Sequence, residues 1–107
     1  MDDFLIGYSH YEEGNFVEAA SYLHRALVAG NLEAASPYAD ICWRNLDKKG
    51  HSMKEAAQWY ICAAYDYGDG DILSFLRSCS IEFAEDTLSR EEKVAKLALI
   101  LKKKEEK

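Results

Sequence analysis

The chain has 107 residues, which suffice for one domain with one hydrophobic core and are too few for two ordinary domains. Hydrophobic residues make up 49% of it and charged residues 30%, a composition typical of a folded globular protein rather than a disordered or membrane protein. The formal net charge of −6 repels the phosphates of nucleic acids and anionic membranes, and it favours basic partners.

The first 14 residues are acidic and only intermittently apolar, whereas a secretory signal begins with basic residues and continues with an unbroken apolar stretch. We therefore expect a cytoplasmic protein. Residues 2–13 should form a first helix, with acidic residues at the end where the helix dipole favours them. Gly14 and Asn15 should form the turn that follows.

The second helix is predicted over residues 15–31. Asn15 and Glu18 have the spacing of a reciprocal capping box, and Gly30 is a typical helix stop. The apolar residues between them recur at the spacing of one buried helical stripe. They are Phe16, Ala19, Ala20, Leu23, Ala26 and Leu27. Because the connection before this helix is short, the first two helices should form an antiparallel hairpin.

A third helix should run from about Leu32 or Ser36 to Leu46. Pro37 fits only near its start, because proline inside a helix costs about 3 kcal/mol. We therefore predict a helix that begins early, with Pro37 in its first turn. Residues 47–51 are polar and include a glycine, so they should form a loop.

Ser52 and Glu55 form an S-x-x-E capping box, which predicts the start of a fourth helix. Its apolar stripe repeats that of the second helix 37 positions later. The six positions are Met53, Ala56, Ala57, Tyr60, Ala63 and Ala64. A further S-x-x-E box, at Ser89 and Glu92, follows after another 37 positions and should open the last helix. Three capping boxes at one spacing predict a helical repeat.

A fifth helix should follow Gly68, with Asp69 or Asp71 as its N-cap. Residues 81–88 either prolong this helix or form an irregular loop. We expect a single domain spanning residues 1–107, with repeats at about residues 2–30, 31–68 and 69–104. The last repeat should serve as a C-terminal cap.

Two stretches carry a resemblance to a known family. The first is Gly14-Asn15-Phe16 with Tyr22-Leu23, Ala26-Leu27 and Gly30-Asn31, and the second is Ala56-x-x-Trp59-Tyr60-x-x-Ala63-Ala64. Over about residues 6–76 the chain resembles tetratricopeptide repeats and, because of its 37-residue period, their Sel1-like relatives more closely. The resemblance implies an all-α fold: an α-α superhelix (solenoid) of about three antiparallel helical hairpins with a concave groove.

Small residues are expected wherever the axes of neighbouring helices approach closely. They are Gly7, Ala19, Ala26, Ala39, Ala56 and Ala63. A bulky residue at one of these positions should overpack the interface between helices.

No motif predicts a catalytic, metal or cofactor site. Cys42, Cys62 and Cys79 are an odd number without ligand spacing, and they should be buried free thiols. The aspartates in residues 66–71 fail the spacing of a calcium loop and are better explained as a helix cap. No serine or cysteine has a convincing base and orienting acid nearby, so an enzyme is disfavoured.

The resemblance implies that side chains of the first helix in each hairpin line the groove and bind a partner. The positions selected are Phe4, Tyr8, Tyr11, Glu12, Asp40, Trp43, Arg44, Ser74 and Ser78. A mixture of aromatic residues, arginine and carboxylates is typical of protein-binding hot spots. For each aromatic residue, packing between the repeats remains an equally good interpretation.

We therefore expect a non-enzymatic module that binds a protein or peptide, preferably a basic one, and neither nucleic acid nor a membrane. One narrower alternative is an acidic bacterial immunity or antitoxin protein that covers the basic active site of a toxin. Another is a secretion or assembly chaperone that holds an extended peptide. The last helix has apolar residues on more than one face, so it could also dock on a second copy as a homodimer.

Overall fold

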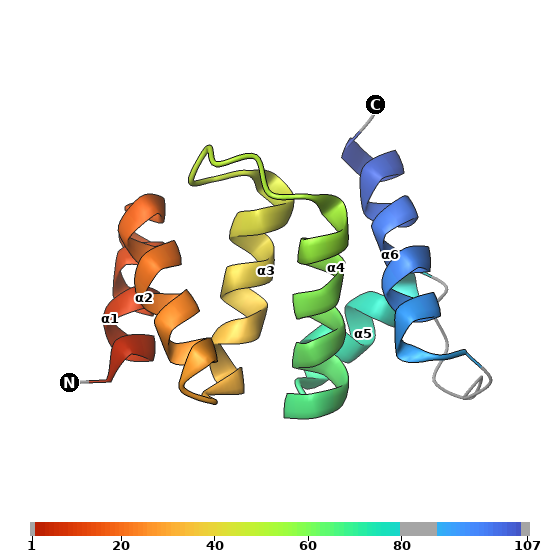
Figure 1. Ribbon diagram of the computed structural model, residues 1–107, viewed down its shortest axis with the longest axis horizontal. Coiled ribbons are helices and arrows are strands. Elements are labelled where there is room, and N and C mark those ends of the chain that lie inside the picture. The colour runs from red at the N-terminus through yellow and green to blue at the C-terminus, as the bar shows by residue number, and fades with distance from the viewer. Residues whose placement is uncertain (1, 80–87, 106–107) are drawn as a thin grey trace.

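The computed structural model describes residues 2–79 and 88–105, and this part of the chain is helical without a strand (Figure 1). The helices are α1 (Asp3–Glu13), α2 (Phe16–Val28), α3 (Ala35–Arg44), α4 (Met53–Ile61), α5 (Gly70–Ser78) and α6 (Arg90–Glu105). A 3₁₀ turn, η1 (Leu32–Ala34), precedes α3, and a π-helical segment, η2 (Cys62–Tyr67), prolongs α4. The all-α prediction is confirmed. Among the described helices, none combines the length and apolar character needed to cross a membrane.

Helices α1 and α2 pack as an antiparallel hairpin, as their short connection predicts (Figure 1). The connection turns at Gly14, whose φ of 84° lies in the left-handed region that glycine adopts without strain. The two helices approach closely at Gly7, where an added Cβ would lie 2.9 Å from Leu23 Cγ and 3.0 Å from the Leu23 backbone nitrogen. The predicted need for a small residue at Gly7 is therefore confirmed.

The capping box predicted at the start of α2 is wrong. The Asn15 side chain accepts no hydrogen bond from the helix, and its amide nitrogen instead lies 3.4 Å from His10 Nδ1. The φ and ψ of Asn15, −87° and 71°, fall outside the extended region usual for a capping residue, so its side chain is not aimed at the first turn.

The boxes predicted for α4 and α6 differ from each other. Ser52 Oγ accepts the Glu55 N–H at 3.1 Å, but the Glu55 carboxylate bonds to His51 instead of returning to Ser52. At α6 the box is reciprocal: the Glu92 N–H donates to Ser89 Oγ at 3.2 Å, and the Ser89 N–H donates to Glu92 Oε1 at 3.3 Å.

Pro37 is the third residue of α3, in its first turn as predicted. A proline is tolerated there because the first backbone N–H groups of a helix have no partner within it. The helix ends at Arg44, two residues before the predicted Leu46, because Asn45 adopts a left-handed conformation with φ 51°.

The chain leaves α2 and η2 through matching hydrogen bonds. The Asn31 N–H donates to the Ala26 carbonyl at 2.9 Å, and the Asp69 N–H donates to the Ala63 carbonyl at 2.9 Å. The two carbonyls are 37 positions apart in the sequence, whereas the two donors are 38 positions apart. The wider π turn of η2 accommodates the additional residue.

Asn31 and Asp69 then cap the elements that follow. Asn31 Oδ1 accepts the Glu33 N–H, and Asp69 Oδ1 accepts the N–H groups of Asp71 and Ile72 at 3.0 and 3.2 Å. The prediction that the aspartates of residues 66–71 include a helix cap is therefore confirmed at Asp69.

The last two helices are arranged differently from the first four. Helix α6 packs along α4, whereas α5 crosses behind α4 and contacts η2 (Figure 1). A longer helix or a loop was predicted for residues 81–88, and most of these residues lie outside the described part of the chain. The core runs through all the helices, and its largest fully buried side chains are Leu23, Ile41, Ile61, Leu76, Leu97, Leu101 and Cys42. All three cysteines are buried free thiols, as predicted.

Candidate functional site

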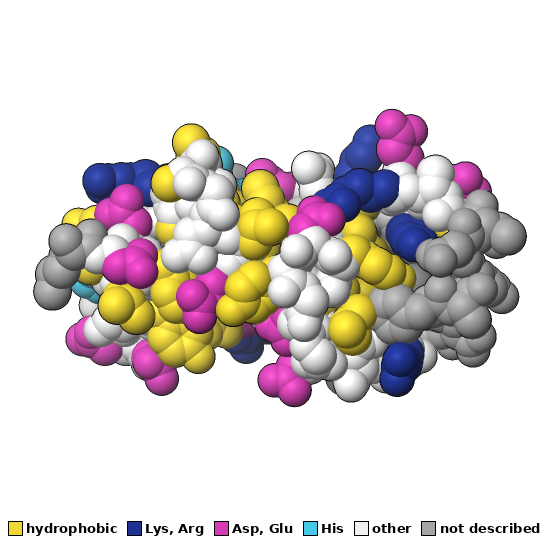
Figure 2. Space-filling model, turned by 90° about the horizontal axis from the view of Figure 1, so that it is seen from below, with side chains coloured by type: hydrophobic (Ala, Val, Ile, Leu, Met, Phe, Trp, Pro, Cys, Tyr) yellow, Lys and Arg dark blue, Asp and Glu magenta, His cyan; other side chains and the backbone are white. Residues whose placement is uncertain are grey.

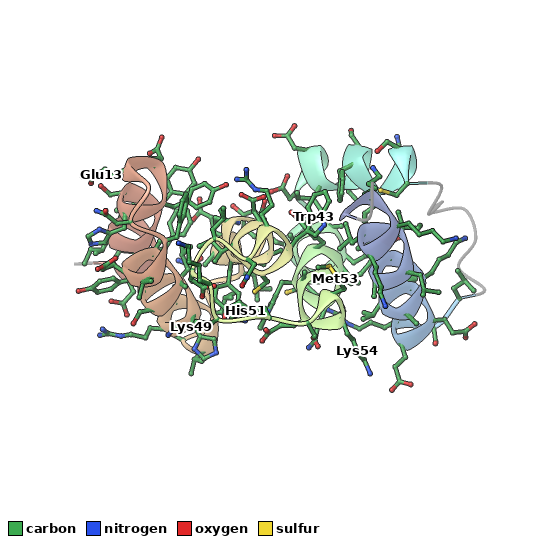
Figure 3. The ribbon with its side chains drawn as sticks, turned by 90° about the horizontal axis from the view of Figure 1, so that it is seen from above. Glu13, Trp43, Lys49, His51, Met53 and Lys54 are labelled. Carbon is green, nitrogen blue, oxygen red and sulfur yellow. The ribbon has the colours of Figure 1, made fainter. Side chains whose placement is uncertain are left out.

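The side chains predicted to bind a partner lie on one surface formed by α1, α3 and α5; in Figure 3, α5 lies at the top of the view and α3 in its middle. We call this surface the α1–α3–α5 face. Its first part is a row of rings on α1. Phe4 is buried beneath Tyr8, with ring centroids 5.7 Å apart, and Tyr8 lies 5.9 Å from Tyr11. Tyr8 is 39% exposed, so its ring is available to a partner.

A polar network links α1 to α3 at the centre of this face. The Tyr11 hydroxyl donates to Asp40 Oδ2. Arg44 donates to the same carboxylate through Nε and Nη2, at 2.8 and 2.6 Å. Two parallel N–H donors on one carboxylate fix the plane of the guanidinium, so the exposed Arg44 is held in one orientation.

The protonation of this network follows from its surroundings. Partial burial and the neighbouring Asp40 carboxylate raise the pKa of Tyr11 to about 12, although Arg44 opposes the shift. The hydrogen bond to Asp40 also raises the pKa of Arg44. At neutral pH Tyr11 is therefore a neutral hydrogen-bond donor, which suits it to structural support and not to general base catalysis.

Trp43 fills the space between α3 and α5 (Figure 3). Its ring lies edge-on to Tyr60 at 6.2 Å and tilted to Phe75 at 5.9 Å, and Tyr60 and Phe75 are 5.3 Å apart. Lys104 of α6 places its ammonium over the Phe75 ring, 5.4 Å from the ring centroid. Trp43 is half-buried, so one part of it supports the core while another part faces solvent.

Three of the predicted residues stand apart from these clusters. Within residues 2–79 and 88–105, no hydrogen bond or ring contact joins Glu12, Ser74 or Ser78 to the network or to Trp43. The Ser78 hydroxyl instead donates to the Phe75 carbonyl at 2.6 Å, a bond within its own helix. All three side chains are exposed at the margin of the face.

The apolar periodicity placed Tyr60 on the buried stripe of the fourth helix, and nothing in the sequence connected Tyr60 or Phe75 with Trp43. Their shared contact with Trp43 depends on how α5 crosses α4, which no local pattern encodes.

The surface around the helix ends is both apolar and acidic. Figure 2 shows the molecule from below, where Asp and Glu side chains are spread among apolar ones over the left and middle of the view. Helix α6 exposes less apolar surface than its sequence suggested: Val94, Leu97 and Leu101 are buried, whereas Leu99 is 63% exposed. The homodimer predicted through α6 would therefore depend on Leu99.

Comparisons of the chain with protein-family models, with curated proteins and with solved structures give no match.

Proposed function

We propose that this chain is a non-enzymatic interaction module that binds a protein or peptide through the α1–α3–α5 face. The observation that carries the proposal is the Tyr11–Asp40–Arg44 network, which holds an exposed arginine in one orientation on the face that also carries the exposed Tyr8 and the half-buried Trp43. Aromatic residues and arginine are the side chains most enriched in binding hot spots. Side chains that are already ordered lose little conformational entropy on binding.

We further propose that the helices form a Sel1-like solenoid of about three antiparallel hairpins. The matching hydrogen bonds to Ala26 and Ala63 support this architecture, as does the close approach of α1 and α2 at Gly7. In such an arrangement the first helix of each hairpin faces the partner and the second helix supports it. The module acts in the cytoplasm.

The net charge of −6 supports a basic partner, since long-range attraction accelerates the encounter of oppositely charged proteins. Two kinds of partner remain to be separated. A folded basic protein, such as a toxin neutralised by an immunity protein, should associate more slowly as salt is added. An extended peptide held by a chaperone should bind with a weaker dependence on salt.

The test compares proteins retained from a native lysate by the immobilised wild-type chain and by two variants. Tyr8→Ala removes an exposed ring from the face, and Val28→Ala is the control, because Val28 is 76% exposed on α2. We expect a protein retained by the wild-type and Val28→Ala chains and lost with Tyr8→Ala, while circular dichroism shows that both variants are folded. Tyr8→Ala is a cleaner probe than Trp43→Ala, because removing Trp43 also takes away the ring that packs on Tyr60 and Phe75.

A purified partner then allows the affinity to be measured. Arg44→Gln should weaken binding about tenfold or more if the rigid arginine is a hot spot. Equal affinity of the wild-type chain, Tyr8→Ala and Arg44→Gln would refute the assignment of this face. The salt dependence of the association rate, measured on the same pair, distinguishes the folded basic partner from the peptide.

A further inference from the structure

A second cluster of reactive side chains lies where α3, the loop after it and α4 meet. Cys42 comes from the last turn of α3, His51 from the loop, and Glu55 from the first turn of α4. The Cys42 sulfur, a ring nitrogen of His51 and a carboxylate oxygen of Glu55 all lie within 4.8 Å of one another. Figure 3 shows His51 on the opposite side of α3 from Trp43, so this cluster is separate from the α1–α3–α5 face.

Cys42 and His51 are shielded from solvent, and the histidine is held on both sides. Cys42 is fully buried, and the His51 side chain is only 14% exposed. His51 Nε2 lies 2.8 Å from Asp47 Oδ2, and Nδ1 lies 2.7 Å from Glu55 Oε1. The Asp47 side chain is itself completely buried, so it is committed to His51 and to the Lys49 N–H.

We propose that Cys42 Sγ, His51 Nδ1 and a Glu55 carboxylate oxygen bind a divalent transition metal ion, for which Zn²⁺ is the best match. One thiolate, one imidazole and one carboxylate suit the borderline-soft Zn²⁺ and do not suit Mg²⁺ or Ca²⁺, which prefer oxygen ligands alone. Zn²⁺ bonding distances of about 2.0 to 2.3 Å require a local rearrangement, in which Nδ1 and Glu55 Oε1, now 2.7 Å apart, separate to admit the metal.

Asp47 supplies the support that such a site requires. A histidine that binds a metal usually donates its other ring N–H to a carboxylate, which fixes the tautomer and the orientation of the ring. When the Nε2–H group donates to Asp47, Nδ1 is the ring nitrogen that faces Glu55. The metal replaces the proton that Nδ1 and Glu55 share, this proton passes to solvent, and both groups become ligands of the metal.

The negative charges around Cys42 favour the binding of a cation, and they disfavour reactions of the free thiol. Burial, together with the carboxylates of Glu55 and Asp47, raises the pKa of Cys42 to about 12, so the metal-free thiol is neutral and a poor nucleophile. Binding of Zn²⁺ forms the sulfur–zinc bond and releases the thiol proton to solvent. The two positive charges of the metal then offset two of the three negative charges carried by the thiolate and the two carboxylates.

A fourth ligand can approach the metal from the side of Glu55, whose side chain is 41% exposed. Three protein ligands with an open fourth position leave room for water or a small anion. Sequence reasoning missed this site because Cys42 and His51 are nine positions apart, which matches none of the common zinc-ligand spacings.

The test titrates the reduced, metal-free full-length chain with Zn²⁺ alone by calorimetry. We expect one Zn²⁺ per chain for the wild type. Cys42→Ser should abolish tight binding, and Cys62→Ser is the matched control, since Cys62 is also buried but lies in η2. Because Cys42→Ser alters a core position, Glu55→Gln provides a second variant at a side chain that is 41% exposed, and it should weaken binding at least tenfold without unfolding the chain.

Two further measurements decide the ligands. Co²⁺ bound in place of Zn²⁺ should show the absorption of a cobalt–thiolate bond in the wild-type chain and in Cys62→Ser, and this band should be missing in Cys42→Ser. Asp47→Asn should weaken Zn²⁺ binding about 10- to 100-fold while the band is retained at saturation. Zn²⁺ binding that is absent in the wild-type chain, or unchanged in folded Cys42→Ser and Glu55→Gln, would overturn the proposal.

Discussion

The first four helices pack against one another in a different arrangement from the last two. Helices α1 and α2 lie against each other, as do α3 and α4, whereas α6 lies mainly along α4 and α5 crosses behind (Figure 1). The capping motif nevertheless continues into α6, where Ser89 and Glu92 form the reciprocal box. Capping depends on three or four adjacent residues, but packing depends on which surfaces meet.

One set of matched positions shows why the packing changes. Ala19 and Ala56 are completely buried, and the residue at the next 37-position interval is Lys93. Lys93 is 9% exposed, and its ammonium lies over the Tyr65 ring, 4.3 Å from the ring centroid. A lysine needs room for its stem and a partner for its charge, so this position of α6 packs differently from Ala19 and Ala56.

The largest change in stability is expected from a substitution that tests whether α6 is part of the common core. Leu97 is fully buried, so Leu97→Ala should destabilise the chain by about 2 to 5 kcal/mol. Leu99→Ala, on the same helix at a 63% exposed side chain, should change stability by about 0.5 kcal/mol at most. Urea unfolding of both variants checks this, and equal midpoints would mean that α6 is not anchored on α4.

The next test concerns the close approach that distinguishes the first hairpin. Gly7→Ala should destabilise the chain by about 1 to 3 kcal/mol, because its Cβ would meet Leu23 at 2.9 Å. Gly70→Ala is the control in the C-terminal region, where a Cβ would meet nothing within 4 Å, and it should be neutral or stabilising by up to about 1 kcal/mol. The melting temperature should therefore fall for Gly7→Ala and stay the same or rise for Gly70→Ala, and a fall for both would contradict the comparison.

Smaller changes in stability are expected at the three predicted capping boxes, and these changes should differ between the boxes. Ser52→Ala and Ser89→Ala should each cost about 1 kcal/mol, because each removes an acceptor for a backbone N–H. Asn15→Ala should cost no more than a few tenths of a kcal/mol, since Asn15 makes no side-chain cap bond. If urea unfolding shows that Asn15→Ala lowers the free energy of unfolding by about 1 kcal/mol, the capping box predicted at α2 is present after all.

The smallest effect comes from the ion pair that ties α6 to η2. Arg90 donates two hydrogen bonds to Asp66 at 2.9 and 2.6 Å and thereby lowers the pKa of that carboxyl. A lowered pKa in the folded state stabilises the chain above the ordinary aspartate pKa of about 3.9, and this contribution is lost as the pH falls through the folded value.

Arg90→Gln should therefore destabilise the chain at pH 7 by about 1 kcal/mol at most, because both side chains are well exposed. The difference from the wild type should shrink as the pH falls below about 3.9 and Asp66 becomes protonated. Urea midpoints across this range provide the measurement. A difference that stays constant with pH would assign the effect to lost packing of the arginine stem.

The helical class and most helix starts were predictable from local patterns. Apolar periodicity placed the helices, Gly14 and Gly30 marked the ends of the first two, and Pro37 was correctly assigned to a first turn. The failure at Asn15 has a physical reason: the motif specifies residue types, but a cap also needs an extended backbone conformation that Asn15 does not adopt.

The candidate sites were predictable only in part. Tyr11, Asp40 and Arg44 were selected as individual positions, and their mutual hydrogen bonds emerged only once α1 and α3 were placed side by side. The cluster of Cys42, His51 and Glu55 gave no signal at all, because it depends on how the loop after α3 folds back onto α4. Local spacing predicts helices well and contacts between helices poorly.

The π-helical segment η2 lets the chain contain one more residue without changing the direction in which it leaves the helix. One residue added to an ordinary α-helix rotates everything after it by about 100° and advances it by about 1.5 Å. In η2 the added residue is taken up by a wider turn, so Asp69 still bonds to the Ala63 carbonyl and caps α5. An additional residue in η2 therefore leaves the direction of α5 unchanged, whereas the same addition within a regular α-helix would reorient the helix that follows.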